Sequence, residues 1–267
     1  MVMAIFGSIG CGNMGGAILG GVAKLEHWRI IGFDPSHAAL EALGERCGLE
    51  ACADETEVAQ RADVILIAVK PQHVQAVVEK IAPHLAGKLL VSLAAGVSLE
   101  RIKTYSANAC PAVVIMPNTP AMVGEGCCAL CLDDPALSDA QKRQVIDLFS
   151  AISTAVVLHE DQIPEFSALI GSGPAFVFHI LESFVEVGLR LGFSQTDARR
   201  LVEKLVLGSV RLAQEAPDMP HATLRMNVCS PGGSSIVGVN ELDRRGVRGA
   251  IIDAVLATHQ RALEMSS

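Results

Sequence analysis

Gly10-Cys11-Gly12-Asn13-Met14-Gly15 is the stretch of sequence that decides the fold. Residues 3–9 before it are apolar apart from Gly7 and Ser8 and predict a buried strand, and the apolar face of residues 17–25 predicts a helix. In such a G-x-G-x-x-G turn the first glycine allows the tight turn, the second lets the backbone approach a pyrophosphate, and the third lets the helix pack on the strand. An ordinary tight turn can carry the same glycines, but the position at the start of a βαβ pattern favours dinucleotide binding.

The composition is that of a globular protein with an acidic balance of charge. Of the 267 residues, 50% are hydrophobic and 19% are charged, and the formal net charge is −8. This charge argues against nucleic-acid and anionic-membrane partners. No apolar run approaches the ~18–20 residues that span a bilayer, and the N-terminus lacks the basic region of a signal peptide. We therefore expect a cytoplasmic protein with no membrane or nucleic-acid partner.

The eight cysteines and eight histidines show no spacing typical of a metal site. Cys128 and Cys131 form a C-x-x-C inside the apolar run 127–132, without a second pair and without a nearby histidine. A buried strand with free thiols explains this pair better than zinc or redox chemistry does, and we predict no metal.

Strand and helix patterns alternate through residues 1–160. Continuous apolar runs predict strands at 29–33, 64–69, 89–93, 112–116, 127–132 and 154–158. Helices are predicted at 38–46, over the i, i+3, i+4, i+7 pattern from Val74 to Ile81, and from Ser138, which forms a capping box with Gln141. The alternation predicts an α/β fold with a Rossmann-type, doubly wound parallel sheet.

Residues 161–267 read as an all-helical second domain. A long helix is expected to begin at residues 171–174 and to end at Gly192, and a second to run from Ser194 to about residue 216. A third helix is expected after residues 230–235, and a fourth over residues 247–265. The first of these carries apolar residues on more than one face, so we expect it to be buried on several sides. A second copy of the chain would cover such helices, which predicts a homo-oligomer formed through this half.

Loops at the carboxyl ends of the predicted strands are candidates for a coenzyme site. Residues 68–71, 94–96 and 116–120 are rich in alanine, glycine and proline, which let backbone lie along a cofactor but also suit plain strand-to-helix turns. Lys70 is a lone cation at such an end, a position that favours a ligand over a solvated loop. Asp34 is placed to accept hydrogen bonds from an adenosine ribose 2′-hydroxyl.

Two loops of the helical half, 171–175 and 230–235, contain no His, Lys, Asp, Glu or Cys. Both can present backbone N–H groups at helix N-termini, which suits a carboxylate. Reduction of a ketone usually needs a positioned acid or base. Reduction of a C=N bond needs less, because a protonated imine is already the electrophile and positioning beside the hydride donor supplies much of the catalysis.

The motifs together resemble the pyrroline-5-carboxylate reductase family. They are G-x-G-N-M at 10–14, V-K-P at 69–71, A-A-G at 94–96, M-P-N-T-P at 116–120, G-S-G-P-A at 171–175 and S-P-G-G at 230–233. The resemblance covers nearly the whole chain and implies reduction of the small cyclic imine L-1-pyrroline-5-carboxylate to L-proline by NADPH or NADH. It also implies a helical dimerisation domain, a homodimer that can assemble into a decamer, and active sites shared between subunits.

The resemblance carries site residues over position by position. Ser235 stands where the family has a threonine facing the imine nitrogen, and it is the expected hydrogen-bonding partner or proton donor, the one catalytic residue. Substrate contacts are expected from Ser172, Gly173, Val228, Gly233, Ser234 and Ser235. Coenzyme contacts are expected from Ile9, Gly10, Cys11, Gly12, Asn13, Met14, Asp34, Ala68, Val69, Lys70, Pro71, Ala94, Ala95, Gly96, Asn118 and Asn227.

The chain departs from the family pattern around the substrate pocket. The usual tyrosine after G-S-G-P-A is Phe176, and the family's arginine, aspartate, threonine and serine are replaced by Val114, Pro164, Ser167 and Ile170. A different cyclic imine, such as a piperideine carboxylate, and a non-catalytic NAD(P)H-binding dimer are therefore the alternatives.

The choice of coenzyme stays open at this point. The Asp34 carboxylate would repel a 2′-phosphate and so favours NADH. Ser36 and His37, however, lie close enough in sequence to accommodate the phosphate of NADPH.

Overall fold

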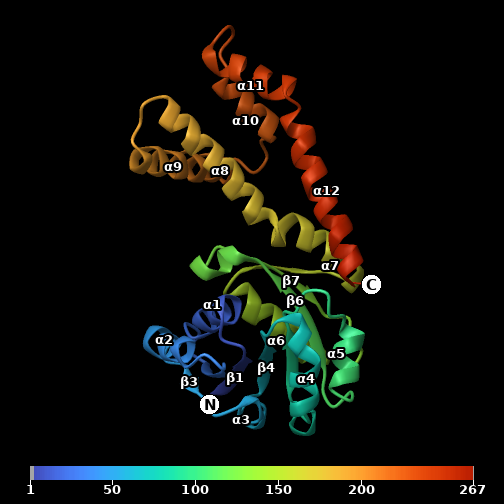
Figure 1. Cartoon of the computed structure of the whole chain (residues 1–267). Helices are drawn as coiled ribbons and strands as arrows, with labels where there is room; N and C mark the ends of the chain where they lie inside the picture. Colours follow the sequence, from blue (N-terminus) through green and yellow to red (C-terminus); the bar gives the residue numbers. More distant parts are fainter. Residues whose placement is uncertain (1–2, 267) are drawn as a thin grey trace. The chain divides into compact units, whose positions relative to one another are not determined.

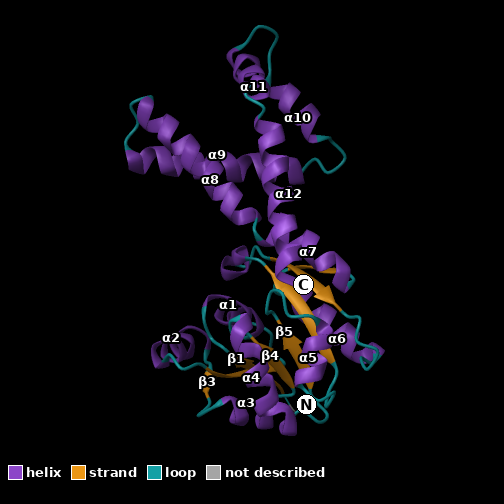
Figure 2. Cartoon of the chain, turned by 45° about the vertical axis from the view of Figure 1, so that its right-hand side comes forward, coloured by secondary structure: helices purple, strands orange, loops and turns teal. Residues whose placement is uncertain are grey.

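The computed structural model describes residues 3–266, with side chains described through residue 264. Contacts divide the chain into two compact units, one holding the residues up to Ser172 together with those from His259 onward, and the other holding Gly173–Thr258. Figures 1 and 2 show a sheet with helices in the first unit and helices alone in the second.

The first unit is built on one eight-stranded sheet with the strand order β3-β2-β1-β4-β5-β6-β7-β8. Every neighbouring pair is parallel except β6 and β7. The order β3-β2-β1-β4-β5-β6 confirms the expected doubly wound, Rossmann-type arrangement. The strands are β1 Ala4–Ile9, β2 Trp28–Phe33, β3 Glu50–Ala51, β4 Val64–Ile67, β5 Leu89–Ser92, β6 Ala112–Pro117, β7 Cys127–Cys131 and β8 Thr154–Val157.

Helices cover both faces of this sheet, and each face has its own hydrophobic core. One core receives α1 Asn13–Val22, α2 His37–Cys47 and α6 Asp139–Ser150, and the other receives α3 Glu55–Arg61, α4 Pro71–Ile81 and α5 Leu99–Tyr105. Successive residues of β4 alternate between them, with Leu66 in the first core and Ile65 in the second. This double burial is why β4 is apolar at every position. The expected capping box of Ser138 and Gln141 is present at α6.

The reversal of β7 is a departure from the expected alternation of parallel units. A parallel connection needs a crossover of about a dozen residues or more. The link from β6 to β7 holds only the short 3₁₀ turn η2, Thr119–Val123, so β7 returns antiparallel beside β6.

The two cysteines of the C-x-x-C motif lie on opposite faces of the sheet. Cys128 belongs to one core and Cys131 to the other, as a spacing of three along a strand requires. Burial raises the pKa of each thiol to about 12. The predicted buried strand with free thiols is confirmed. Among the described residues, no group of three or more His, Cys, Asp or Glu side chains could hold a metal ion.

One short 3₁₀ turn, η1 Ala82–His84, lies between α4 and β5. After β8 the chain leaves the sheet through η3 Glu160–Gln162, α7 Ile163–Phe166 and the π-helical turn η4 Ser167–Gly171. The remaining helices are α8 Gly173–Arg190, α9 Gln195–Gln214, α10 His221–Val228, α11 Ser234–Arg244 and α12 Val247–Ser266. Helices α8 and α9 pack closely at Gly188, where an added Cβ would lie 2.7 Å from the Cβ of Ala198.

Two expectations concern the burial and the hydropathy of the helical half. The long helix was expected to be buried on several sides. Within one chain α8 has no buried residue, and Phe178 is 65% exposed, so this burial stays a prediction for the oligomer. The stretch Glu160–Arg190 is also long and apolar enough, by length and composition, to cross a membrane. The expectation that no such stretch exists was too strict, because scattered polar residues do not lower its mean hydropathy enough.

Candidate active site

The glycine-rich turn between β1 and α1 contains two glycines that packing requires and one that packing does not. Gly10 has a φ of +96°, and a Cβ there would lie 2.5 Å from the carbonyl oxygen of Ala68. A Cβ on Gly15 would overlap the carbonyl oxygen of Gly10. A Cβ on Gly12, by contrast, would meet no atom within 4 Å. Because Gly12 has no side chain, the space beside the turn stays open.

Gly12 is also the N-cap residue immediately before α1, and it provides no side-chain cap for the helix. The N–H groups of the first helical turn point out of a helix N-terminus, where an anion is favourably bound. Open space and uncapped N–H groups at one point fit the diphosphate of a dinucleotide.

Hydrogen bonds hold this turn against the end of β2. The N–H of Gly10 donates to the carbonyl oxygen of Phe33 at 2.9 Å, and the buried Ser8 hydroxyl donates to the carbonyl oxygen of Gly10 at 2.7 Å. Ser8 was not among the predicted site residues. Its signal in the sequence was a hydroxyl in an otherwise apolar strand, because a buried polar group needs a partner.

Asp34 lies directly beside the turn. Its Oδ2 accepts a hydrogen bond from the N–H of Cys11 and its Oδ1 accepts one from the N–H of Ser36, both at 2.8 Å. The neighbouring Cys11 thiol stays protonated, because burial, reinforced by the charge of Asp34, raises its pKa to about 12. Each oxygen of the Asp34 carboxylate keeps a lone pair for a ligand after its backbone bond.

The loops after β4 and β5 lie along the same carboxyl edge of the sheet. Ala68 follows β4 and donates from its N–H to the carbonyl oxygen of Ile9, so residues 68–71 adjoin the glycine-rich turn. Lys70 is exposed at the position before α4, with Pro71 as the first residue of that helix. Residues 94–96 follow β5, where Gly96 turns with a φ of +75°. This edge of the sheet thus carries the glycine-rich turn, Asp34, residues 68–71 and residues 94–96.

Asn118 uses its side chain within the protein. It is 8% exposed, its Oδ1 accepts from the N–H of Cys127 at 2.9 Å, and its Nδ2 donates to the carbonyl oxygen of Ile170 at 3.2 Å. The amide therefore ties the end of β6 to β7 and to the π-helical turn η4. A π-turn often marks a functional site, and this one ends with the N–H of Ser172 donating to the carbonyl oxygen of Ser167 at 2.9 Å.

The other predicted substrate residues belong to the helical unit, as does Asn227, a predicted coenzyme contact. Asn227 and Val228 end α10, and a turn through Gly232, with a φ of +70°, leads to Gly233 at the start of α11. Gly233 gives α11 no side-chain cap, and Ser234 and Ser235 are exposed in its first turn. Residues 230–235 offer N–H groups and three hydroxyls but no ionisable side chain, as the sequence indicated.

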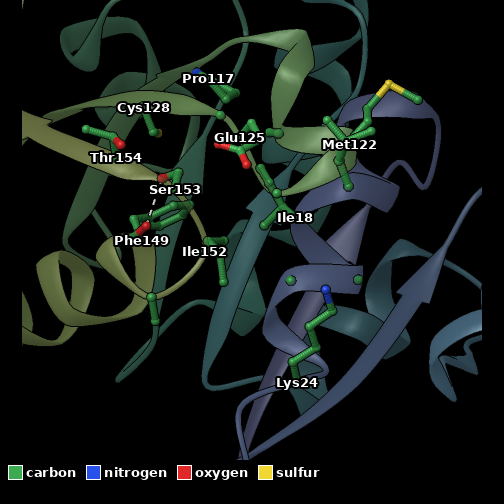
Figure 3. A pocket seen from close by; sticks show the side chains of 18 of the residues that line it. Ile18, Lys24, Pro117, Met122, Glu125, Cys128, Phe149, Ile152, Ser153 and Thr154 are labelled. Carbon is green, nitrogen blue, oxygen red and sulfur yellow. Dashed lines mark hydrogen bonds between the residues drawn. The ribbon is translucent and has the colours of Figure 1, made fainter. Parts of the chain in front are cut away.

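Two cavities lie in the first unit. One of about 660 Å³, between α1, η2 and the start of β8, contains none of the predicted site residues (Figure 3). The second, of about 790 Å³, includes Ala94, Ala95 and Gly96, and its apolar wall includes Val114 and Pro164. Three of the departures from the family pattern, Val114, Pro164 and Ser167, therefore meet in one cavity, next to a predicted coenzyme loop.

Comparisons with known proteins agree in both halves of the chain. Residues 160–265 match the family described as pyrroline-5-carboxylate reductase dimerisation, and residues 5–96 match NADP oxidoreductase coenzyme F420-dependent. The pyrroline-5-carboxylate reductase of Escherichia coli (strain K12) is 33% identical over 264 residues, covering 97% of each chain. The chain belongs to the pyrroline-5-carboxylate reductase family.

Solved structures of this family have the same fold. The Plasmodium falciparum pyrroline carboxylate reductase, solved with NADP bound, has a TM-score of 0.89 at 28% identity and covers 100% of both chains. The pyrroline-5-carboxylate reductase of Coxiella burnetii has a TM-score of 0.89 at 32% identity and covers 99% of both chains. The resemblance drawn from the motifs is confirmed. This member of the family is an NAD(P)H-dependent oxidoreductase with a helical dimerisation domain.

Proposed function

We propose that this chain reduces L-1-pyrroline-5-carboxylate to L-proline, the last step of proline biosynthesis, with NADPH or NADH. The observation that carries the proposal is the open space at Gly12 beside an uncapped helix N-terminus, in a chain of this family. We further propose that residues 1–160 hold the coenzyme and residues 161–267 hold the substrate and the dimer contact.

The first unit binds and orients the coenzyme. Cys11 to Met14 receive the diphosphate at the start of α1, and Asp34 receives the adenosine ribose. Residues 68–71 and 94–96 lie under the nicotinamide half, and Asn118 holds the edge in place through its bonds to Cys127 and Ile170. When bound, the nicotinamide supplies the hydride.

The loop before α11 binds the imine. The N–H groups at Ser234 and Ser235 suit the substrate carboxylate, because they belong to an uncapped helix N-terminus. The N–H of Gly233 is bound to the carbonyl oxygen of Ser230 at 2.9 Å. The Ser235 hydroxyl meets the imine nitrogen as a hydrogen-bonding partner or proton donor. A serine is sufficient for this role, since an iminium ion arrives protonated and needs positioning more than a strong acid.

The exposed apolar helices support assembly of identical subunits. Phe178 and Phe184 of α8 and Leu191, the residue after it, are 65%, 46% and 72% exposed. Large apolar side chains exposed in this way are typical of an interface. We propose a homodimer as the basic assembly, a decamer of five dimers as the higher one, and a cytoplasmic protein that binds neither membranes nor nucleic acids.

The test follows the absorbance of NADPH and of NADH with pyrroline-5-carboxylate and with its six-membered homologue. The proposal expects faster turnover of the five-membered imine. Preference for the six-membered ring would favour the piperideine alternative, for which the apolar wall of Val114 and Pro164 is the supporting observation. Coenzyme binding without turnover of either imine would favour the alternative of a non-catalytic NAD(P)H-binding dimer.

A further inference from the structure

The end of β2 carries information about which coenzyme the protein selects. NADH and NADPH differ only at the adenosine ribose, where a 2′-hydroxyl in the first is a phosphate in the second. In a Rossmann fold this ribose lies at the end of the second strand, beside the glycine-rich turn. Asp34 occupies that place and is joined to the turn through Cys11. We propose that Asp34 makes this reductase select NADH over NADPH, an inference that rests on the proposed function.

Asp34 is held so that it cannot turn away from an approaching ligand. Both of its oxygens accept backbone N–H groups at 2.8 Å, one from Cys11 before α1 and one from Ser36 before α2. A rotation of the side chain would leave both N–H groups without their acceptor, and the Cys11 bond is part of the turn itself. The carboxylate therefore presents a fixed negative charge at this corner.

The sequence around Asp34 supplies no cation to offset that charge. No lysine or arginine occurs between Arg29 and Arg46. Arg29 pairs with Glu50 at 2.9 Å, and Arg46 donates to the carbonyl oxygen of Gly16 at 2.7 Å. Both of these guanidinium groups already have partners in the described structure.

Two neighbours of Asp34, Ser36 and Pro35, are also poorly suited to a phosphate. The N–H of Ser36 is bound to Asp34, and the Ser36 hydroxyl oxygen accepts from the N–H of Ala39 at 3.4 Å as the cap of α2. His37 is exposed at the first position of that helix. Pro35 has no N–H to give.

The remaining lone pairs of the carboxylate match the ribose of NADH. A ribose with free 2′- and 3′-hydroxyls offers two O–H donors, and each oxygen of Asp34 keeps one lone pair after its backbone bond. A 2′-phosphate offers only negatively charged acceptors, which the carboxylate repels at short range. The same two oxygens that fix the turn thus accept the diol and reject the phosphate.

The test measures binding of NAD⁺ and NADP⁺ to the whole protein by isothermal titration calorimetry, alongside kcat/KM for NADH and NADPH. We expect the wild-type protein to bind NAD⁺ at least about tenfold more tightly than NADP⁺. Asp34→Asn keeps the size of the side chain and removes the charge, so the ratio should fall several-fold, mainly through tighter NADP⁺ binding. Glu41→Gln removes an exposed charge from α2, the helix that follows Asp34, and should leave the ratio unchanged.

Equal or tighter binding of NADP⁺ by the wild-type protein would overturn the inference without any variant, and so would an unchanged ratio in folded Asp34→Asn. If neither coenzyme bound to the folded protein, the proposed function itself would fail. Circular dichroism of each variant separates a lost preference from a lost fold.

Discussion

The side-chain amide of Asn118 donates to the carbonyl oxygen of Ile170 at 3.2 Å and so joins the end of β6 to the π-helical turn before α8. The same amide accepts from the N–H of Cys127. A residue that the motifs assign to the coenzyme site therefore also fixes the start of the G-S-G-P segment.

Asn118→Ala should lower both stability and turnover. The partly buried N–H of Cys127 would lose its acceptor, which costs about 1 kcal/mol in the free energy of unfolding. Asn118→Asp keeps an acceptor for Cys127 but cannot donate to Ile170 when ionised, so it isolates the link to the π-turn. Urea denaturation and steady-state kinetics measure the two effects. Wild-type kinetics in Asn118→Asp would show that the Ile170 bond is dispensable.

Gly12→Ala and Gly10→Ala should fail in different ways. A methyl group on Gly12 meets no protein atom, so the melting temperature should be unchanged while coenzyme affinity falls at least about tenfold. A methyl group on Gly10 meets Ala68 at a positive φ and should cost about 1–3 kcal/mol of stability. Thermal melts and coenzyme titration distinguish the two variants. Normal coenzyme affinity in Gly12→Ala would show that the diphosphate does not bind at this turn.

Ser235→Ala should lower kcat while coenzyme affinity stays nearly constant, because the hydroxyl is assigned to the imine nitrogen. Ser235→Thr should retain the activity, since it keeps the hydroxyl. Ser209→Ala removes an exposed hydroxyl that bonds to its own helix at Leu205, and it serves as the matched control. An unaltered kcat in Ser235→Ala would exclude this residue from the mechanism.

Asp134 should contribute to the free energy of unfolding of the first unit near neutral pH and lose this contribution in acid. Its side chain is 1% exposed, lies 2.9 Å from Lys103 Nζ, and accepts the N–H groups of Ala112 and Ala136. Burial alone would raise the pKa of Asp134, but the bonds from Ala136, Lys103 and Ala112 outweigh it and hold the pKa below its usual value.

A carboxylate whose pKa is lower in the folded state stabilises the fold fully above the unfolded value of about 3.9 and loses that contribution as the pH falls through the folded value. Asp134→Ala should cost about 3–5 kcal/mol near neutral pH and flatten this acid limb. Glu203→Gln, in an exposed pair with Arg199, should change neither. Denaturation curves across pH measure both, and an unaltered acid limb in Asp134→Ala would contradict the assignment.

Phe178→Asp combined with Phe184→Asp should weaken the oligomer. These side chains are exposed in one chain, so the change should leave the fold of the subunit intact and shift the mass in light scattering toward a monomer. Glu182→Gln, on the same α8 helix, should leave the mass unchanged. A wild-type protein of monomer mass at micromolar concentration would refute assembly altogether.

Much of the first unit was predictable from the sequence because its strands are buried on both faces. β4 is apolar at all four positions, and β1, β5 and β6 are likewise continuous enough to identify. β3 escaped notice because it is only Glu50 and Ala51, paired with β2 and exposed. α3 is short and buries only Val58 and Ala59, too few residues for a helical period to appear.

The site was predictable in its segments but not in its bonds. The glycine pattern marked the turn, and the distance along the chain marked Asp34. That Asp34 also accepts from Cys11, and that Asn118 bonds to Ile170, depend on strand order and on a π-turn that spacing does not reveal. Helix α10 was missed because Pro217 and Pro220 favoured a loop, whereas Pro220 immediately precedes the helix. The domain boundary near residue 160 stays a prediction.

The return of α12 to the first unit makes the helical unit an insertion with both of its ends in the same neighbour. His259 Nε2 lies 3.3 Å from Glu165 Oε1, and Ala262 and Leu263 line the cavity that includes Ala94. Cutting the chain at Ser172 would therefore not release an intact coenzyme-binding half, because part of its wall is encoded nearly ninety residues later. A single proteolytic nick in the helical unit should leave both fragments associated.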